Sequence, residues 1–207
     1  MELSTHDSVA VLRFTPMAGY PRLGTAVLGE LDELLHEVQR SALFSAVVIA
    51  SNTQSFVTGA AIEEVAAREG YAALKFALRG QSTFHRIQGF HLPVVAAIRG
   101  YCLGGGLDLA LACHARVASF DASFGHPGAS LGLLTGWGGT SRLPRLVGKS
   151  TALEMFLTAD RVPATQALAM GLVDELVPSA DLVSVAARRA QGLLARGKPD
   201  KCYSWNL

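Results

Sequence analysis

The sequence predicts an α/β fold, and three observations support this prediction. Short apolar runs of strand length recur along the chain, as at residues 45–51 and 93–98. Segments with apolar residues at helical spacing, such as residues 28–38, lie between those runs. Strands that alternate with helices in this way pair in parallel through right-handed crossovers. With 207 residues, the chain is long enough for one domain with its own core.

Each element follows from its local pattern. The predicted strands are 9–14, 45–51, 93–98, 116–120, 122–124 and 172–177. The predicted helices are 28–38, 62–78 with an interruption near Gly70, 81–87, 107–113, 140–147, 150–159 and 163–170. A last helix is expected from about residue 182, capped by Ser179 and ended by Gly197 and Pro199. Residues 201–207 show no clear pattern.

The composition excludes several classes of function. Half of the residues are hydrophobic and 17% are charged, which is typical of a compact globular protein. The formal net charge is +1 and no basic run is present, so nucleic acid and anionic membranes are not expected partners. No apolar run approaches the ~20 residues of a membrane helix, and the polar, acidic N-terminus does not resemble a secretory signal. Three widely spaced cysteines indicate a reducing compartment, so we expect a cytoplasmic protein.

Two kinds of site lose support when their context is considered. The six histidines and three cysteines show no ligand spacing, so we expect no metal site. Ser130 lies in a G-x-S-x-G sequence, but the glycine-rich segment after it is a poor helix, which argues against a nucleophilic serine.

The glycine run at residues 104–106 joins a buried strand to a buried helix and is followed by one carboxylate, Asp108. A helix N-terminus offers unpaired N–H groups, and glycines let a substrate oxygen approach them. The run therefore fits half of an oxyanion hole. It fits equally well a turn that lets the helix pack tightly on the sheet.

A second small-residue turn leads into a helix at Phe56-Val57-Thr58-Gly59-Ala60-Ala61. In a parallel α/β array, turns that follow neighbouring strands meet at one edge of the sheet. Two backbone N–H groups from the two turns would complete the hole.

With these two turns, the sequence resembles the crotonase superfamily, the enoyl-CoA hydratase/isomerase family. The similar segments, in chain order, are 56–64, 93–110, 124–132, 136–143, 147–150, 157–161 and 167–173. The resemblance implies a ββα superhelix, the ClpP/crotonase fold, in a single domain over residues 1–207. Its spiral core would span 1–175, and a shortened C-terminal helical part would span 176–207. It also implies assembly as trimers or hexamers.

The resemblance assigns functions to particular residues. Family members bind acyl-CoA or acyl-carrier thioesters and hold a thioester enolate on two N–H groups, here those of Ala60 and Gly105. The substrate-binding segments would be Phe56, Val57, Thr58, Gly59, Ala60, Ala61, Gly104 and Gly105. No cofactor is expected beyond the CoA of the substrate itself. The activity implied is that of a lyase of fatty acid metabolism.

The catalytic acids depart from the family pattern. Hydratases of this family use two glutamates, and here Asp108 stands at the first position and Gly128 at the second. Asp108 is expected to be the acid/base, and His126, two residues before the missing glutamate, is a candidate substitute. Two alternatives remain open. One is decarboxylation or another enolate reaction on a CoA or carrier-protein thioester. The other is a degenerate member that only binds partners or supports an oligomer.

Overall fold

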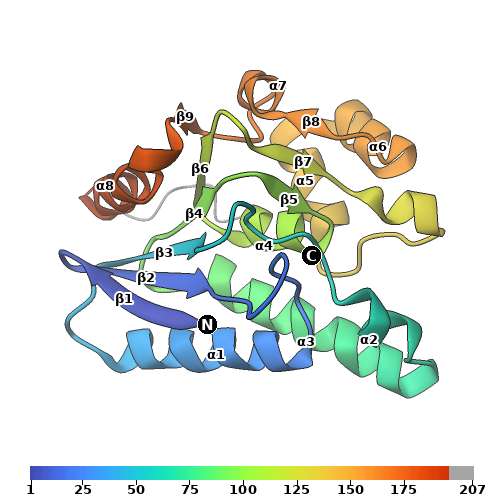
Figure 1. Ribbon diagram of the computed structural model, residues 1–207, viewed down its shortest axis with the longest axis horizontal. Helices are drawn as coiled ribbons and strands as arrows, with labels where there is room; N and C mark the ends of the chain where they lie inside the picture. The colour runs from blue at the N-terminus through green and yellow to red at the C-terminus, as the bar shows by residue number, and fades with distance from the viewer. Residues whose placement is uncertain (196–207) are drawn as a thin grey trace.

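The core of the protein is a six-stranded sheet with the strand order β1-β2-β3-β4-β6-β9 (Figure 1). The computed structural model describes residues 1–195. The strands are β1 (Glu2–His6), β2 (Val9–Phe14), β3 (Ala46–Ser51), β4 (Val94–Ile98), β6 (Ala115–Ser119) and β9 (Glu175–Val177). All neighbours pair in parallel except β1 and β2, which form an antiparallel hairpin. The predicted α/β class is therefore confirmed.

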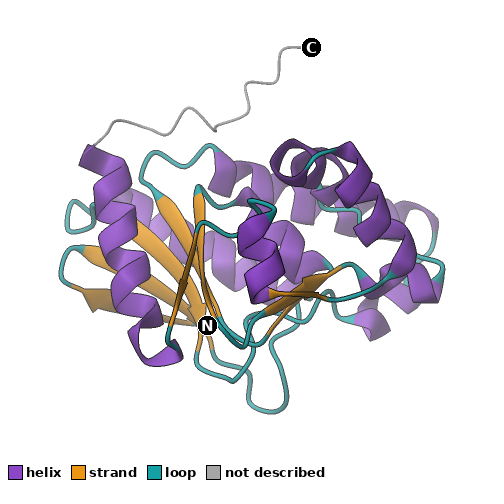
Figure 2. Ribbon diagram, turned by 90° about the horizontal axis from the view of Figure 1, so that it is seen from above, coloured by secondary structure: helices purple, strands orange, loops and turns teal. Residues whose placement is uncertain are grey.

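Strand residues alternate between two cores, one on each face of the sheet. Ala10, Leu12 and Ile49 belong to the larger core, which includes buried residues of α1 (Thr25–Arg40), α3 (Gly70–Gln88) and α4 (Gly105–Ala112). Val11 and Val48 belong to the smaller core, which is covered by α8 (Leu182–Ala195). The two groups of helices lie on opposite sides of the strands (Figure 2). Nearly continuous apolar strands are required because both faces are buried.

A second, three-stranded sheet extends the fold into a spiral. Its strands are β5 (Tyr101–Leu103), β7 (Ser123–Gly125) and β8 (Val162–Pro163), in that order. β4 continues into β5 after Gly100, which has a φ of +53°, and α4 follows directly. An isolated β-bridge between Val57 and Cys102 extends the same arrangement to the preceding turn of the spiral, which contains residues 56–61. Strand, strand and helix thus repeat as the resemblance implies.

Several boundaries differ from the prediction. β1, β5 and β8 were not predicted, because β1 is a polar edge strand and the other two are very short. Residues 62–88 form α2 (Ile62–Ala66) and one continuous α3, rather than two helices separated near residue 80. Pro163 ends β8 and precedes α7 (Ala164–Ala169), so it lies just outside the helix that it was expected to begin.

The helices of the C-terminal third are close to the prediction. They are α5 (Gly139–Val147), α6 (Lys149–Thr158), α7 and α8, with 3₁₀ turns η1 (Pro127–Leu131) and η2 (Ser179–Asp181). Ser179 does not cap α8, which begins at Leu182: it starts η2, and its hydroxyl donates to Asp121 Oδ1 at 3.0 Å. The predicted stop signals Gly197 and Pro199, and residues 201–207, lie outside the described residues. Within residues 1–195, no helix is both long and apolar enough to cross a membrane.

Candidate active site

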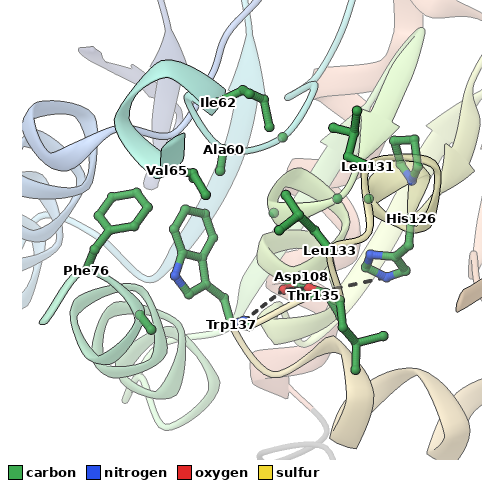
Figure 3. Close-up of a pocket in the computed structure, with 18 of the residues that line it drawn as sticks. Ala60, Ile62, Val65, Phe76, Asp108, His126, Leu131, Leu133, Thr135 and Trp137 are labelled. Atoms are coloured by element: carbon green, nitrogen blue, oxygen red, sulfur yellow. Dashed lines mark hydrogen bonds and ion pairs between the residues drawn. The ribbon is translucent and has the colours of Figure 1, made fainter. Parts of the chain in front are cut away.

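A cavity of about 370 Å³ opens where three turns of the spiral meet (Figure 3). The first turn contributes Thr58, Gly59 and Ala60, and the second contributes Gly104, Gly105 and Asp108. The third turn contributes residues 126–128, and the segment before α5 contributes 133–137. The remaining lining residues are Arg22, Ile62, Val65, Arg68, Ala73, Phe76, Ala77, Leu131 and Phe156.

Backbone pairing orients the first turn. Leu23 N–H donates to Gly59 O at 2.9 Å, and Ala61 N–H donates to Leu23 O at 3.0 Å. In an extended chain, successive N–H groups point to opposite sides. The N–H of Ala60 therefore points away from Leu23. Gly59 supplies the positive φ, +125°, that this turn requires.

The second turn lies against the first. Gly104 has a φ of +51°, and α4 begins at Gly105, whose N–H has no partner within the helix. A Cβ built on Gly105 would lie 3.5 Å from the Ala60 nitrogen. The two N–H groups that were predicted to form an oxyanion hole, those of Ala60 and Gly105, thus lie on neighbouring segments. Gly106 has a different function, because a Cβ there would lie 2.1 Å from Val57 O, so this glycine allows α4 to pack on the strand.

Some predicted binding residues lie outside the cavity wall. Phe56 and Val57 are fully buried in the core, where the Phe56 ring packs edge-on against Phe14. Val57 O accepts a hydrogen bond from Leu103 N–H at 3.0 Å, which ties the two turns together. Ala61 is the N-cap residue of α2. These three residues support the turn, whereas Thr58, Gly59 and Ala60 line the cavity.

Asp108 lies on the first turn of α4 and is fully buried, yet it reaches the cavity. Its Oδ2 accepts hydrogen bonds from the Thr135 hydroxyl and from Trp137 N–H, the latter at 3.2 Å (Figure 3). Burial raises the pKa of Asp108 to about 6, although these donors and the nearby Arg142 charge act in the opposite direction. A carboxyl group with this pKa can exchange protons near neutral pH.

His126 lies beside Asp108. Its Nε2 is 3.8 Å from Asp108 Oδ1, which is too long for a hydrogen bond, and its ring centroid is 5.0 Å from that of Phe156. Neither ring nitrogen has a hydrogen-bond partner in the described part of the chain. Burial lowers the pKa of His126 to about 4, so the imidazole is neutral at physiological pH.

The remaining wall carries no acid. Gly128, which the resemblance was expected to place at the second glutamate position, lies in η1, and Leu131 and Leu133 also line the cavity. Pairing of Leu133 N–H with Gly128 O, at 2.9 Å, folds this segment back over the cavity. Asp108 is therefore the only carboxylate among the described lining residues, whose other charged side chains are those of Arg22 and Arg68.

Sequence reasoning did not identify the loop that holds Asp108. Thr135 and the Trp137 backbone contact the carboxylate, and Gly139 is required because a Cβ there would lie 2.1 Å from Asp108 Oδ1. The buried Arg142 fixes this loop by donating to Trp137 O at 2.9 Å and to Gln88 Oε1 at 3.0 Å. The glycines around Trp137 were a visible signal, but nothing in their spacing points to Asp108.

The fold and this pair of turns define the class of protein. The profile of the enoyl-CoA hydratase/isomerase family matches residues 5–201, and the chain belongs to that family. Among solved structures, DspI of Pseudomonas aeruginosa is similar, with a TM-score of 0.88 and 32% identity over 96% of this chain and 75% of that chain. An enoyl-CoA hydratase from Bacillus anthracis has a TM-score of 0.87 and 30% identity over 95% of this chain and 76% of that chain. The predicted crotonase fold is thereby confirmed.

Curated relatives are more similar in sequence. The chain is 46% identical, over 174 residues, to the fatty acid oxidation complex subunit alpha of Shewanella frigidimarina. That match covers 82% of this chain but only 24% of the relative. The protein of the same name from Shewanella sp. strain ANA-3 is 45% identical over 83% of this chain and 25% of its own length. The chain thus spans about a quarter of the length of these curated relatives.

Proposed function

We propose that the protein is an enzyme of the enoyl-CoA hydratase/isomerase type that acts on acyl-CoA or acyl-carrier thioesters of fatty acid metabolism. The observation that carries this proposal is the adjacency of the Ala60 and Gly105 N–H positions beside Asp108. The thioester oxygen would accept from both N–H groups, where the partial positive charge of the α4 N-terminus stabilises a developing enolate. Removing one such donor typically lowers a rate by ~10²–10³.

Asp108 would transfer the protons. In hydration, its carboxylate would take a proton from water while the water oxygen bonds to C3 of the enoyl group. The negative charge would pass to the thioester oxygen, and the carboxyl would then return the proton to C2. The hydrogen bonds from Thr135 and Trp137 hold Oδ2, whereas Oδ1 is buried beside the Gly139 backbone, 3.8 Å from His126 Nε2. The exchange would therefore use Oδ1 after a small movement that turns it toward the cavity.

His126 would orient the water. Buried imidazole nitrogens normally have a hydrogen-bond partner, and those of His126 have none within residues 1–195. His126 Nε2 and Asp108 Oδ1 are both shielded from solvent and lie 3.8 Å apart, so a small outward movement of the ring would admit a water molecule that satisfies both groups. A neutral imidazole can donate to or accept from that water.

The test is the loss of conjugated-thioester absorbance when the protein is mixed with crotonyl-CoA. Asp108→Asn is the informative variant, because the amide oxygen can still accept from Thr135 and Trp137 while the side chain cannot transfer a proton. Turnover by the wild type that falls by at least ~10²-fold in the variant supports the proposal. Equal turnover in both proteins contradicts the role of Asp108.

Decarboxylation is a second candidate, favoured by the apolar wall at Gly128, Leu131 and Leu133. Loss of CO₂ breaks a carbon–carbon bond and leaves its electron pair on the enolate, so no base is needed. A carboxylate held against apolar side chains is poorly solvated, which promotes its departure. Release of CO₂ from malonyl-CoA, without turnover of crotonyl-CoA, would select this candidate. Thioester binding with neither reaction would instead indicate a non-catalytic member.

We also propose that copies of the chain associate as trimers or hexamers, as the family resemblance implies. Light scattering coupled to size-exclusion chromatography tests this assembly. A mass equal to that of one chain at micromolar concentration would refute it.

A further inference from the structure

The Trp137 ring is wedged between two glycines from different helices. A Cβ built on Gly80 of α3 would lie 2.3 Å from Trp137 Nε1, and one on Gly105 of α4 would lie 2.5 Å from Cζ3. Real Cβ atoms do not approach so closely, so the ring fills the space between the two backbones. The presence of a glycine inside α3, where it lowers helix propensity, is explained by this contact.

Aromatic neighbours hold the ring in place. Phe76 and Phe84 pack edge-on against it, with centroid distances of 5.2 and 5.7 Å. The Trp137 backbone is fixed separately, because its N–H donates to Asp108 and its carbonyl accepts from Arg142. The residue is only 5% exposed, yet it lines the cavity. It is therefore a rigid part of the wall.

The ring also stands directly beside the thioester position. Gly105 carries one of the two N–H groups proposed to hold the thioester oxygen, and the indole fills the space between Gly105 and Gly80 of α3. On this side of the cavity, the wall that an acyl chain attached to that thioester would meet consists of Trp137, Phe76 and Val65. Beyond the ring, toward Gly80 and Phe84, the interior is filled.

From this geometry we infer that Trp137 limits the length of the acyl group and that the preferred substrates are short-chain thioesters. This inference rests on the proposed function and names its substrate class. Shortening the side chain at residue 137 would extend the cavity toward Gly80. Adding a methyl group at Gly80 would push the ring into the cavity and shorten it.

The experiment measures kcat/KM for 2-enoyl-CoA substrates of four to twelve carbons with three variants. In the wild type we expect kcat/KM to fall steeply as the acyl chain lengthens, because one methylene group that does not fit an apolar pocket changes kcat/KM by ~10–200-fold. Trp137→Leu is expected to move the optimum to longer chains, and Gly80→Ala to reduce activity on all but the shortest. In the double variant the new methyl group has room beside leucine, so the restriction caused by Gly80→Ala is expected to disappear.

Two further measurements keep the test decisive. Circular dichroism and thermal unfolding identify a variant that does not fold, in which case Trp137→Phe replaces Trp137→Leu. If the wild type turns over none of these substrates, the proposed hydration fails, and calorimetric affinities for saturated acyl-CoAs of the same lengths test the inference independently. A chain-length profile, in turnover or in affinity, that is the same in all four proteins would overturn the inference.

Discussion

The two sides of the cavity differ in how they are built, although the family resemblance implies a carboxylate on each. On the α4 side, Asp108 is buried and its Oδ2 is held by Thr135 and Trp137 N–H. On the η1 side, Gly128 presents only backbone, with Leu133 folded over it. Asp108 is thus the single carboxylate among the described residues that line the cavity, which also include Arg22 and Arg68.

Ionisation of Asp108 should destabilise the fold. Because burial raises its folded pKa to about 6, above the unfolded value of 3.8, stability is lost as pH rises between these values. We predict that Asp108→Asn raises the free energy of unfolding at pH 8 by about 3 kcal/mol and leaves it nearly unchanged at pH 3. Urea denaturation at both pH values checks this. No gain at pH 8 would contradict the raised pKa.

A matched control is Asp174→Asn. Asp174 pairs with the buried guanidinium of Arg116 at 3.2 Å, so its loss should destabilise the protein at pH 8. The two Asp→Asn changes therefore have opposite expected signs.

Introducing an acid on the η1 side of the cavity, at Gly128, should raise the rate of hydration. In Gly128→Glu, the new Cβ would lie 3.0 Å from Leu133 O, so this segment must move by a few tenths of an ångström. We expect crotonyl-CoA hydration to increase by ~10²-fold, a typical contribution of a general acid or base. Gly128→Gln provides the control, since it is similar in size but cannot transfer protons. An equal change in both variants would attribute the effect to shape alone.

Removing a hydrogen bond that holds Asp108 should weaken catalysis. In Thr135→Val the hydroxyl donor to Asp108 is lost, so the pKa of Asp108 should rise and the acidic limb of kcat/KM should move to higher pH. Arg142 and His126 are the other groups with charge or protons nearby, and both remain. We expect a ~10-fold decrease at pH 6 and recovery in Thr135→Ser. A decrease without movement of the pH limb would mean that Thr135 only supports packing.

The smallest expected effect concerns His126. Burial lowers its pKa to about 4, so its imidazole should not titrate between pH 5 and 8. Proton NMR of the ring should show a constant chemical shift over this range in the folded protein. In urea the same signal should titrate near ~6.5. Titration near 6.5 in the folded state would show that the ring is solvated and charged in the site.

The sequence was sufficient for the parts of the structure that depend on local patterns. The apolar runs at β3 and β4 and the helical spacing in α1 are visible because each buries a regular face. The edge strand β1 escaped prediction because its polar residues lack such a face. Asp108, Ala60 and Gly105 were placed through the family resemblance, and the structure brings them together.

The loop around Asp108 could not be predicted in this way. Thr135 reaches Asp108 across 27 positions of sequence, and Gly80 is explained only by the Trp137 ring packed against it. Such contacts arise from the tertiary packing of α3, α4 and the segment before α5. No periodicity within any one of these segments encodes them.

The most direct test of the account is deuterium exchange at the α-carbon of butyryl-CoA in D₂O, followed by NMR or mass spectrometry. Exchange requires only an enolate held in the site and a group that moves the proton, whatever the subsequent reaction. We predict exchange with the wild type and its loss in Asp108→Asn. Exchange at the same rate in both proteins would contradict the assignment of Asp108 as the acid and base of this site.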